Sequence, residues 1–294
     1  MNFQSGGAFR RALEERLNTK AKATGLPLVR LRKMVAFDRF LARLVSAQPD
    51  AWALKGGLAL QLRLGGRSRT TKDIDLLSFA MTDQVLPLLR VAAALDMKDW
   101  FTFEVSEPER GSITDQAEQR YSIQTLLDGR TFENFHVDIG IGDAVVEPLE
   151  HLEITDLLSF AGLSLTSVPC YPVTQQIAEK LHAYTKPRKS GESSRVKDLV
   201  DLLLLTELQT VSSDRLRHAI RATFSTEGTH PIPGSVPPPP VKWESEFRRM
   251  ASEVGLSTTL LDQAYNLVQA FLNPVLAGEP PSEWDPVKRS WQDS

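Results

Sequence analysis

Two aspartates, Asp73 and Asp75, stand one residue apart within residues 54–79, downstream of a glycine pair, Gly56-Gly57. Strand side chains alternate between faces, so both carboxylates would lie on one side of a strand. Carboxylates that close repel each other unless a cation lies between them. Proteins hold Mg²⁺ with one or two carboxylates, and water and substrate phosphates fill its remaining positions. The spacing therefore favours a metal-dependent phosphate site, with Mg²⁺ as the cofactor and Mn²⁺ as the alternative.

The glycine pair strengthens this interpretation. Glycines before a helix let backbone N–H groups approach a phosphate, and the helix N-terminus adds a favourable dipole. A glycine pair alone is weak evidence, and Asp-x-Asp is common among solvent-exposed acids, which is the alternative reading. The combination is more specific: Lys55-Gly56-Gly57, a short helix to Leu64, and then RSRTTKDID over 67–75.

A third acid, Asp138, lies in the alternating sequence FHVDI at 135–139. Asp128-Gly129 is a strong hairpin signal and predicts that strands 121–127 and 131–141 are paired. If the second of these strands also pairs beside 73–79, Asp138 joins the first two carboxylates. Three carboxylates with two metal ions could stabilise both the attacking and the leaving oxygen in a displacement at phosphorus. The alternative is a solvent-facing acid on an edge strand.

Two later helices, predicted over 173–184 and 196–208, carry the remaining candidates. On the first, Lys180 flanks the apolar stripe and could reach a cleft. On the second, Lys197 and Asp201 are four residues apart and therefore lie on neighbouring turns. A lysine near a triphosphate would stabilise the leaving pyrophosphate by its charge, whereas the alternative is an ordinary helix salt bridge.

The periodicity of the chain predicts an α/β (α+β) protein with a domain over 1–170, built from a sheet and N-terminal helices, and a helical domain over 171–294. The expected helices are two within 8–49, the second over about 29–47, and others over 57–64, 85–98, 173–184, 196–208, 242–253 and 257–272. The expected strands are 73–79, 101–105, 121–127 and 131–141. A proline-rich passage at 231–240 is expected to brace the surface, with a polyproline recognition motif as the alternative.

Composition limits the classes of function. The chain has 294 residues, 41% hydrophobic and 24% charged, which is typical of a globular protein with one large or two moderate domains. Its net charge is −3, yet residues 10–33 hold eight Arg or Lys and two acids. That run is either a solvated helix face or a patch for a polyanion.

A single cysteine, Cys170, excludes an internal disulfide and a cysteine-based zinc framework. Like His136 and His182, we interpret it as structural. The N-terminal sequence lacks the apolar run of a signal peptide, and no segment reaches ~18 uninterrupted apolar residues. We therefore expect a cytoplasmic protein without a membrane partner.

The order of these motifs resembles the AbiEii/MenT family of nucleotidyltransferase-like toxins from about Leu54 to Ala270. The segments that carry the resemblance are KGGLAL, RTTKDIDLL, HVDI, QQIAEKLHA, RVKDLVDLLLL and THPIP with the downstream Trp243. It implies a polymerase-β-type nucleotidyltransferase domain with a mixed sheet, and a helical domain that completes the active-site cleft. Such proteins are toxins of bacterial toxin–antitoxin or abortive-infection modules, and several transfer nucleotides from an NTP to the 3′ end of tRNA, which blocks translation.

The resemblance also implies roles for single residues. Asp73, Asp75 and Asp138 match the metal-binding acids, Gly56 and Gly57 the phosphate turn, and Lys180 and Asp201 the catalytic lysine and aspartate of the two helix motifs. Lys55, Arg69, Thr71 and Lys197 would bind the nucleotide. Leu58 departs from the family pattern, in which a small polar residue often follows the glycines, so the backbone is left as the phosphate donor. A cognate antitoxin could modify Thr71, because phosphate there would repel the nucleotide.

The leading hypothesis is thus an Mg²⁺-dependent nucleotidyltransferase with an NTP as donor and tRNA as acceptor. Basic residues suit an approaching phosphate backbone and outnumber the one acid, Glu192, between 180 and 197: Lys180, Lys186, Arg188, Lys189, Arg195 and Lys197. Two alternatives stay open. One is transfer to a small molecule, and the other is an interaction protein that binds NTP without catalysis.

Overall fold

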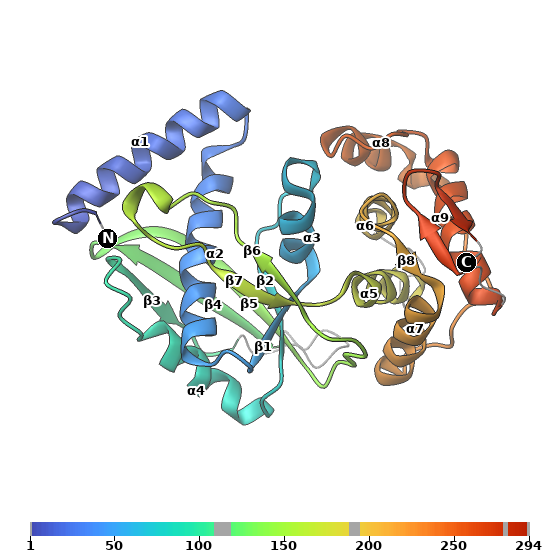
Figure 1. Cartoon of the computed structure of the whole chain (residues 1–294), viewed down its shortest axis with the longest axis horizontal. Coiled ribbons are helices and arrows are strands. Elements are labelled where there is room, and N and C mark those ends of the chain that lie inside the picture. The colour runs from blue at the N-terminus through green and yellow to red at the C-terminus, as the bar shows by residue number, and fades with distance from the viewer. Residues whose placement is uncertain (1, 109–118, 188–194, 279–281, 293–294) are drawn as a thin grey trace. The chain divides into compact units, whose positions relative to one another are not determined.

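The computed structural model describes residues 2–108, 119–187, 195–278 and 282–292, which form two compact units (Figure 1). The first unit contains Met1–Leu62, Thr70–Gly142 and Glu150–Cys170. The second contains Arg63–Arg69, Asp143–Leu149 and Tyr171–Ser294. The chain therefore crosses between the units several times before its helical C-terminal part begins.

A seven-stranded mixed sheet forms the frame of the first unit, in the order β3-β4-β5-β2-β1-β7-β6. β2 is parallel to β5 and β1 is parallel to β7, whereas the other neighbours are antiparallel. The strands are β1 (Trp52–Lys55), β2 (Ile74–Ser78), β3 (Phe101–Val105), β4 (Gln119–Leu127), β5 (Arg130–Ile141), β6 (Glu150–Glu153) and β7 (Ser167–Cys170). β2 to β5 were predicted from the sequence, and β1, β6 and β7 were not.

Helices α1 (Gly6–Thr24), α2 (Leu28–Ala47) and α4 (Thr82–Ala93) share one hydrophobic core with the sheet. Phe37 and Phe40 of α2 stack edge-on against Phe135 of β5. Most of the residues that alternate with the core residues on β4 and β5 are polar, and they are partly buried or exposed. One face of this part of the sheet is therefore committed to the core, and the other is available for chemistry.

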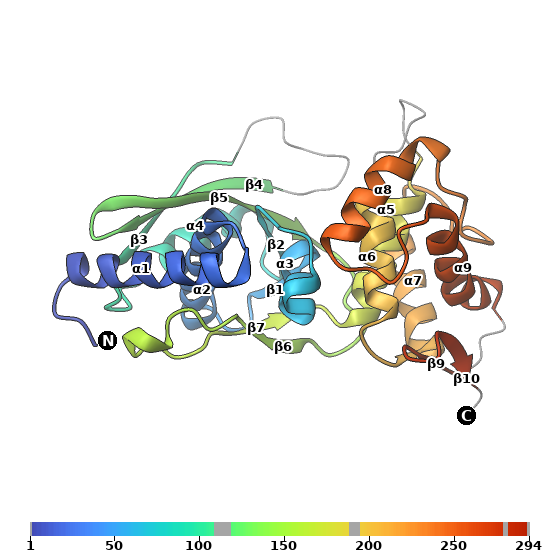
Figure 2. The ribbon, with the colours of Figure 1, turned by 90° about the horizontal axis from the view of Figure 1, so that it is seen from above.

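β4 and β5 form a hairpin (Figure 2). Its register places the turn at Asp128 and Gly129, as the sequence predicted. Both residues have positive φ, 53° and 69°, which is the conformation of a type I′ turn. Arg10 of α1 donates to the carbonyls of Leu127, Arg130 and Thr131 at 2.9, 3.1 and 3.0 Å. Part of the basic N-terminal run thus holds this hairpin.

Other members of that basic run also have intramolecular partners. Arg32 pairs with Glu14 at 2.6 Å, and Lys33 donates to the Asn134 carbonyl at 2.7 Å. The guanidinium of Arg16 lies 4.3 Å from the centre of the Phe160 ring. These contacts agree with a helix face that serves the fold.

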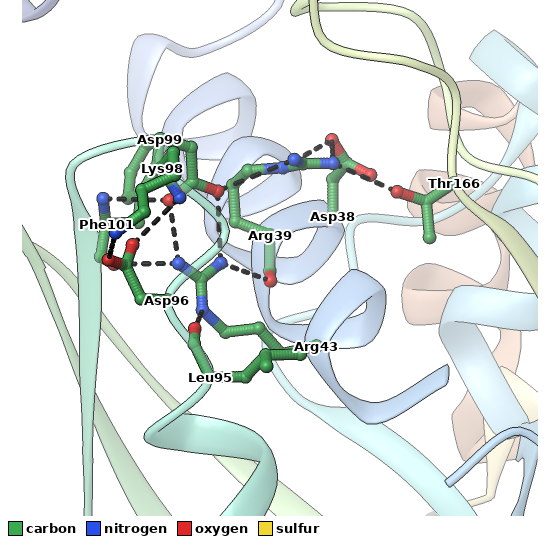
Figure 3. Close-up of polar contacts among 9 residues, drawn as sticks. All are labelled: Asp38, Arg39, Arg43, Leu95, Asp96, Lys98, Asp99, Phe101 and Thr166. Carbon is green, nitrogen blue, oxygen red and sulfur yellow. Dashed lines mark hydrogen bonds and ion pairs between the residues drawn. The ribbon is translucent and has the colours of Figure 1, made fainter. Parts of the chain in front are cut away.

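A buried ionic cluster joins α2 to the segment before β3 (Figure 3). Arg43 and Asp99 are both 0% exposed, and Arg43 donates to the two carboxylate oxygens at 2.7 and 3.1 Å. Arg43 also donates to the carbonyls of Leu95 and Phe101 at 3.1 and 2.8 Å. The helix predicted over 85–98 ends earlier, at Ala93, because the following residues turn to present Asp99 to Arg43.

The second unit is mostly helical and also contains a small three-stranded sheet (Figure 1). Its helices are α5 (Val173–Thr185), α6 (Val196–Thr206), α7 (Ser213–Glu227), α8 (Glu244–Glu253) and α9 (Leu261–Ala277). Its strands are β8 (Val211–Ser212), β9 (Glu283–Asp285) and β10 (Ser290–Gln292). Tyr184 and Tyr265 donate to the carbonyls of Pro237 and Val236 at 2.8 and 2.9 Å, so the proline-rich passage braces this unit.

The most apolar helix, α6, has eleven residues, and ten of them are buried. A helix needs about 20 apolar residues to span a bilayer. Within the described ranges, no helix has the length and apolarity that crossing a membrane requires.

Candidate active site

Four charged residues lie side by side across the sheet, and we call them the charged row. Asp75 of β2 is the register partner of Lys55 on β1 and of Asp138 on β5. Asp138 is in turn the partner of Arg120 on β4. Register partners on neighbouring strands point to the same face. Two carboxylates therefore lie next to each other between two cations.

The next position along the sheet carries Asp73 and His136. Asp73 directly precedes β2, and its Oδ1 atom lies 3.3 Å from Nδ1 of His136 on β5. Both side chains are partly exposed, 32% and 40%. The structure thus brings Asp73, Asp75 and Asp138 to one face, whereas His136, which we interpreted as structural, lies within the same site. Its position two residues before Asp138 was the available signal.

The glycine turn is packed directly on Asp75. β1 runs without a loop into α3 (Gly56–Leu64), and Gly56 has φ +63°, the left-handed region that favours glycine. A Cβ atom at Gly56 would lie 2.1 Å from Oδ2 of Asp75. The Gly57 N–H donates to the same oxygen at 3.2 Å. No other residue type fits at position 56 without displacing this carboxylate.

Thr71 and Leu58 complete the surroundings of the turn. The Thr71 hydroxyl donates to the Asp73 carbonyl at 3.0 Å and would lie 3.1 Å from a Cβ at Gly57. Leu58 is 1% exposed and belongs to the core. Its side chain therefore plays no part at the surface of the turn.

Arg120 forms an ion pair with Asp138. Its Nε and Nη2 atoms donate to the two oxygens at 2.7 and 2.6 Å, a bidentate geometry that fixes both planes. The Arg120 side chain is 38% exposed, so the pair borders solvent. Arg120 was not among the predicted site residues, because its partner lies on another strand, 18 residues away.

A pocket of about 790 Å³ lies on the polar face of β3, β4 and β5. Asp73, His136 and Arg120 are part of its lining, so it adjoins the charged row. Its lining also includes Lys33, Ser122, Gln124 and Asn134. Its size is typical of sites for small ligands.

Asp73 and Asp75 fit a divalent cation that substrate phosphates help to hold, whereas both oxygens of Asp138 accept from Arg120. Asp73 and Asp75 offer hard oxygen ligands on one face. The Asp75 carboxylate lies so close to Gly56 that a Cβ atom at position 56 would not fit. Among the described residues, however, no group of three or more His, Cys, Asp or Glu side chains could hold a metal ion by itself. Mg²⁺ does not require such a cage, because one or two carboxylates with water and phosphates suffice. Asp73 and Asp75 are the residues that would hold it.

The second unit contains a separate ionic cluster around Asp201. This residue is 0% exposed and accepts from Arg69 at 2.9 and 2.7 Å and from Lys180 at 2.9 Å. Lys180 also lies 3.2 Å from Asp198. Burial alone would raise the pKa of Asp201, but the neighbouring Lys180 and Arg69 outweigh it and lower that pKa. Burial likewise opposes the charge of Lys180, yet Asp201 and Asp198 raise its pKa above the usual value. Lys180 and Asp201 therefore both stay charged.

The other candidates of this unit are placed as follows. Lys197 is exposed, and Asp201 pairs with Lys180 and Arg69. Arg69 was expected to bind the triphosphate. In the structure its Nε and Nη2 atoms donate to the two carboxylate oxygens of Asp201. Of the basic run at 180–197, Arg188 and Lys189 lie outside the described residues, as does Glu192.

Comparison with solved structures supports the predicted fold. MenT4, a nucleotidyltransferase toxin from Mycobacterium tuberculosis, has a TM-score of 0.58 and 18% identity, over 91% of this chain and 89% of that one. JHP933 from Helicobacter pylori has a TM-score of 0.41 and 15% identity, over 84% and 93%. The similarity to MenT4 confirms the nucleotidyltransferase fold with a mixed sheet and a helical part.

The comparison with curated protein sequences finds no match. The comparison with protein families matches residues 39–290 to the family described as nucleotidyl transferase AbiEii toxin, type IV TA system. That range includes the glycine turn, the charged row and the Asp201 cluster. The chain therefore belongs to the AbiEii family of nucleotidyl transferase toxins of type IV toxin–antitoxin systems.

Proposed function

We propose that this toxin transfers a nucleotidyl group from an NTP to an RNA hydroxyl, at the 3′ end of tRNA, and thereby blocks translation. The observation that carries the proposal is the charged row beside the glycine turn, where Asp75 touches the backbone of Gly57 and lies opposite Asp138. Family membership supports the reaction class, and the geometry supports the roles of the residues.

On one side of Asp75, the backbone N–H of Gly56 and the cation of Lys55 would bind the triphosphate. The Gly57 N–H donates to Asp75 in the structure and would join them by exchanging that bond for one to phosphate. When bound at Asp73 and Asp75, Mg²⁺ would counter the negative charge that develops on the phosphate oxygens. Asp138 would be the third ligand or would help to orient the acceptor. In the structure its charge is balanced by Arg120.

The proposed transfer is a single displacement. The acceptor hydroxyl oxygen forms a bond to the α-phosphorus, and the bond from this phosphorus to the oxygen that bridges to the β-phosphate breaks. Pyrophosphate leaves, and the hydroxyl proton passes to a carboxylate of the site and from there to solvent. The role of the chain is to position both substrates and to stabilise charge.

Catalytic roles for Lys180 and Asp201, and nucleotide binding by Arg69 and Lys197, are proposed on the family motifs. The cluster gives Lys180 a permanent positive charge, which suits a role toward phosphate and does not suit proton transfer. Lys180→Met would test this, because it removes the cation and keeps the length of the side chain. Loss of transfer without loss of the folded state would support the role, and an unchanged rate would contradict it.

The direct test of the function is to incubate the protein with each labelled NTP, Mg²⁺ or Mn²⁺, and total tRNA. Label in the tRNA, lost with Asp75→Ala, is the expected result. Label only in small molecules would favour the alternative transferase. NTP binding without any product would favour the non-catalytic interaction protein.

A type IV toxin–antitoxin family implies a cognate antitoxin and an NTP substrate. We place the reaction in the cytoplasm, where tRNA and NTPs are found, and we propose Thr71 as the position at which the antitoxin could act by modification. The Thr71 hydroxyl bonds to the Asp73 backbone, so phosphate there would place negative charge beside the acids. Intact-mass analysis of toxin coexpressed with antitoxin tests this, and an unchanged mass would contradict it.

A further inference from the structure

We infer that the pocket over β3, β4 and β5 is the subsite for the terminal nucleotide of a single-stranded RNA acceptor, and that Gln124 and Asn134 read its base. This inference rests on the proposed function and assigns a substrate class to one side of the same site.

The strand order places the two substrates on opposite sides of the acids. Along the row, Lys55 lies beyond Asp75 on the β1 side, and Arg120 lies beyond Asp138 on the β4 side. The glycine turn, which suits the triphosphate, is on the β1 side. In an in-line displacement the attacking and leaving oxygens are on opposite sides of the phosphorus. With pyrophosphate leaving toward the glycine turn, the acceptor hydroxyl must arrive from the β4 side, where the pocket lies.

The distance between the pocket and the acids suits one nucleotide. His136 lines the pocket and contacts Asp73, and it precedes Asp138 by two residues on the same face. Two strand residues span about 7 Å. A base seated farther along the pocket can thus leave its sugar hydroxyl at the carboxylates.

The floor of the pocket has the chemistry to hold a nucleobase. Gln124 of β4 is the register partner of Asn134 on β5, and Ser122 is the partner of His136. Side-chain amides present both donors and acceptors, which the edge of a base requires. The Gln124 amide donates to Thr131 Oγ1 at 3.2 Å, which orients it.

The charges around this floor suit a phosphodiester backbone. Lys33, Lys72 and Arg120 line the pocket with the acids Asp73 and Glu104. Lys33 is held in place by the Asn134 carbonyl at 2.7 Å and by Glu133 at 3.5 Å, and Arg120 is held by Asp138. Cations in fixed positions beside an open polar face favour RNA over an uncharged acceptor.

The test separates binding from transfer. The probe is a short single-stranded RNA with a 5′ fluorescein and a 3′-deoxy end, which can bind but cannot react at that position. Gln124→Ala and Asn134→Ala should each weaken its binding about tenfold in fluorescence anisotropy. With reactive RNA the same variants should raise the KM for RNA by a similar factor, while NTP binding changes less than about twofold.

Thr102→Ala is the matched control, because Thr102 is exposed on β3 and is not part of the pocket lining. It should leave both substrates unaffected. Ser122→Trp, checked for its melting temperature, should fill the pocket and exclude the RNA probe.

The outcomes distinguish the two proposals. Probe binding that is weakened by the pocket variants, in a protein that transfers nothing, would keep the subsite and overturn the proposed function. Transfer to RNA with an unchanged KM in Gln124→Ala, Asn134→Ala and Ser122→Trp would overturn the subsite and keep the function. Weaker NTP binding in these variants would assign the pocket to the donor and would likewise overturn the inference.

Discussion

Two ionic clusters of the first unit differ in what surrounds them. In the cluster of Figure 3, Arg43 and Asp99 are completely buried, and the guanidinium also bonds to backbone carbonyls. In the charged row, Asp138 and Arg120 border solvent and a pocket. The first cluster is not accessible to a ligand, so it stabilises the fold. The second keeps its charges where a substrate could meet them. Within the first unit, burial separates the structural ion pair from the candidate site more than the identity of the charged residues does.

The largest expected effect comes from breaking the buried cluster. Asp99→Ala leaves Arg43 charged and unpaired in the core, which should lower the free energy of unfolding by about 3–5 kcal/mol. Urea denaturation followed by circular dichroism measures it. Glu107→Ala, which removes an exposed ion pair to Arg90 in the same unit, should leave the midpoint nearly unchanged. Equal midpoints for the two variants would contradict the structural role of the buried cluster.

The next largest effect is expected in the charged row and on activity. Asp75→Ala should reduce nucleotide transfer by about 10²–10³-fold, because it removes a preorganised charge at the reacting phosphate. Its melting temperature should change little, since Asp75 is only partly buried. Asp75→Asn keeps an acceptor for the Gly57 N–H, so its activity separates the charge from that hydrogen bond. Transfer at the wild-type rate in both variants would exclude Asp75 from catalysis.

A smaller effect is expected for the partner of Asp138. Arg120→Ala should lower RNA affinity about tenfold, because a charge-assisted contact at the pocket is lost. The free energy of unfolding should fall by less than about 1 kcal/mol, since the pair is partly exposed. Arg90→Ala, which removes an exposed ion pair to Glu107, is the control for both measurements. A large loss of stability in Arg120→Ala would place this pair with the buried cluster.

The smallest effect at neutral pH concerns His182 in the second unit. Burial, His230, Lys186 and Arg195 lower its pKa from 6.5 to about 4. The unfolded chain therefore binds more protons between these values, and this contribution to stability is complete above pH 6.5 and is lost as the pH falls toward 4. The melting temperature should fall over this range, and less steeply in His182→Gln. His218→Gln, on the exposed face of α7, should keep the wild-type slope.

The sequence identified the strands that carry the acids because their apolar residues alternate. It did not identify β1, β6 and β7, which have four residues each. β1 is buried at every position, so it has no alternation to detect. Helix α7 was also missed, although its buried residues Leu216, Ala219, Ile220, Thr223 and Phe224 recur at helical spacing.

The site residues that could not be predicted from the sequence are those that reach the site through pairing between strands. Asp73, Asp75 and the glycine turn are close in sequence, so their spacing was sufficient to predict them together. Arg120 and His136 join them only through the register of β4, β5 and β2. The sequence likewise gives no sign that Arg69 is held by Asp201, 132 residues away.

The central position of β1 in the sheet also affects when the site can form during synthesis. β1 carries Lys55 and leads into the glycine turn, yet its neighbours are β2 and β7, and β7 ends at Cys170. Until that segment has been synthesised, one edge of β1 has no partner strand. β5 must also be synthesised before Asp138 can lie opposite Asp75. Chains fold from the N-terminus as domains emerge. A nascent or truncated toxin that ends before residue 170 would therefore lack the complete sheet. The complete site would form only after more than half of the chain had been synthesised.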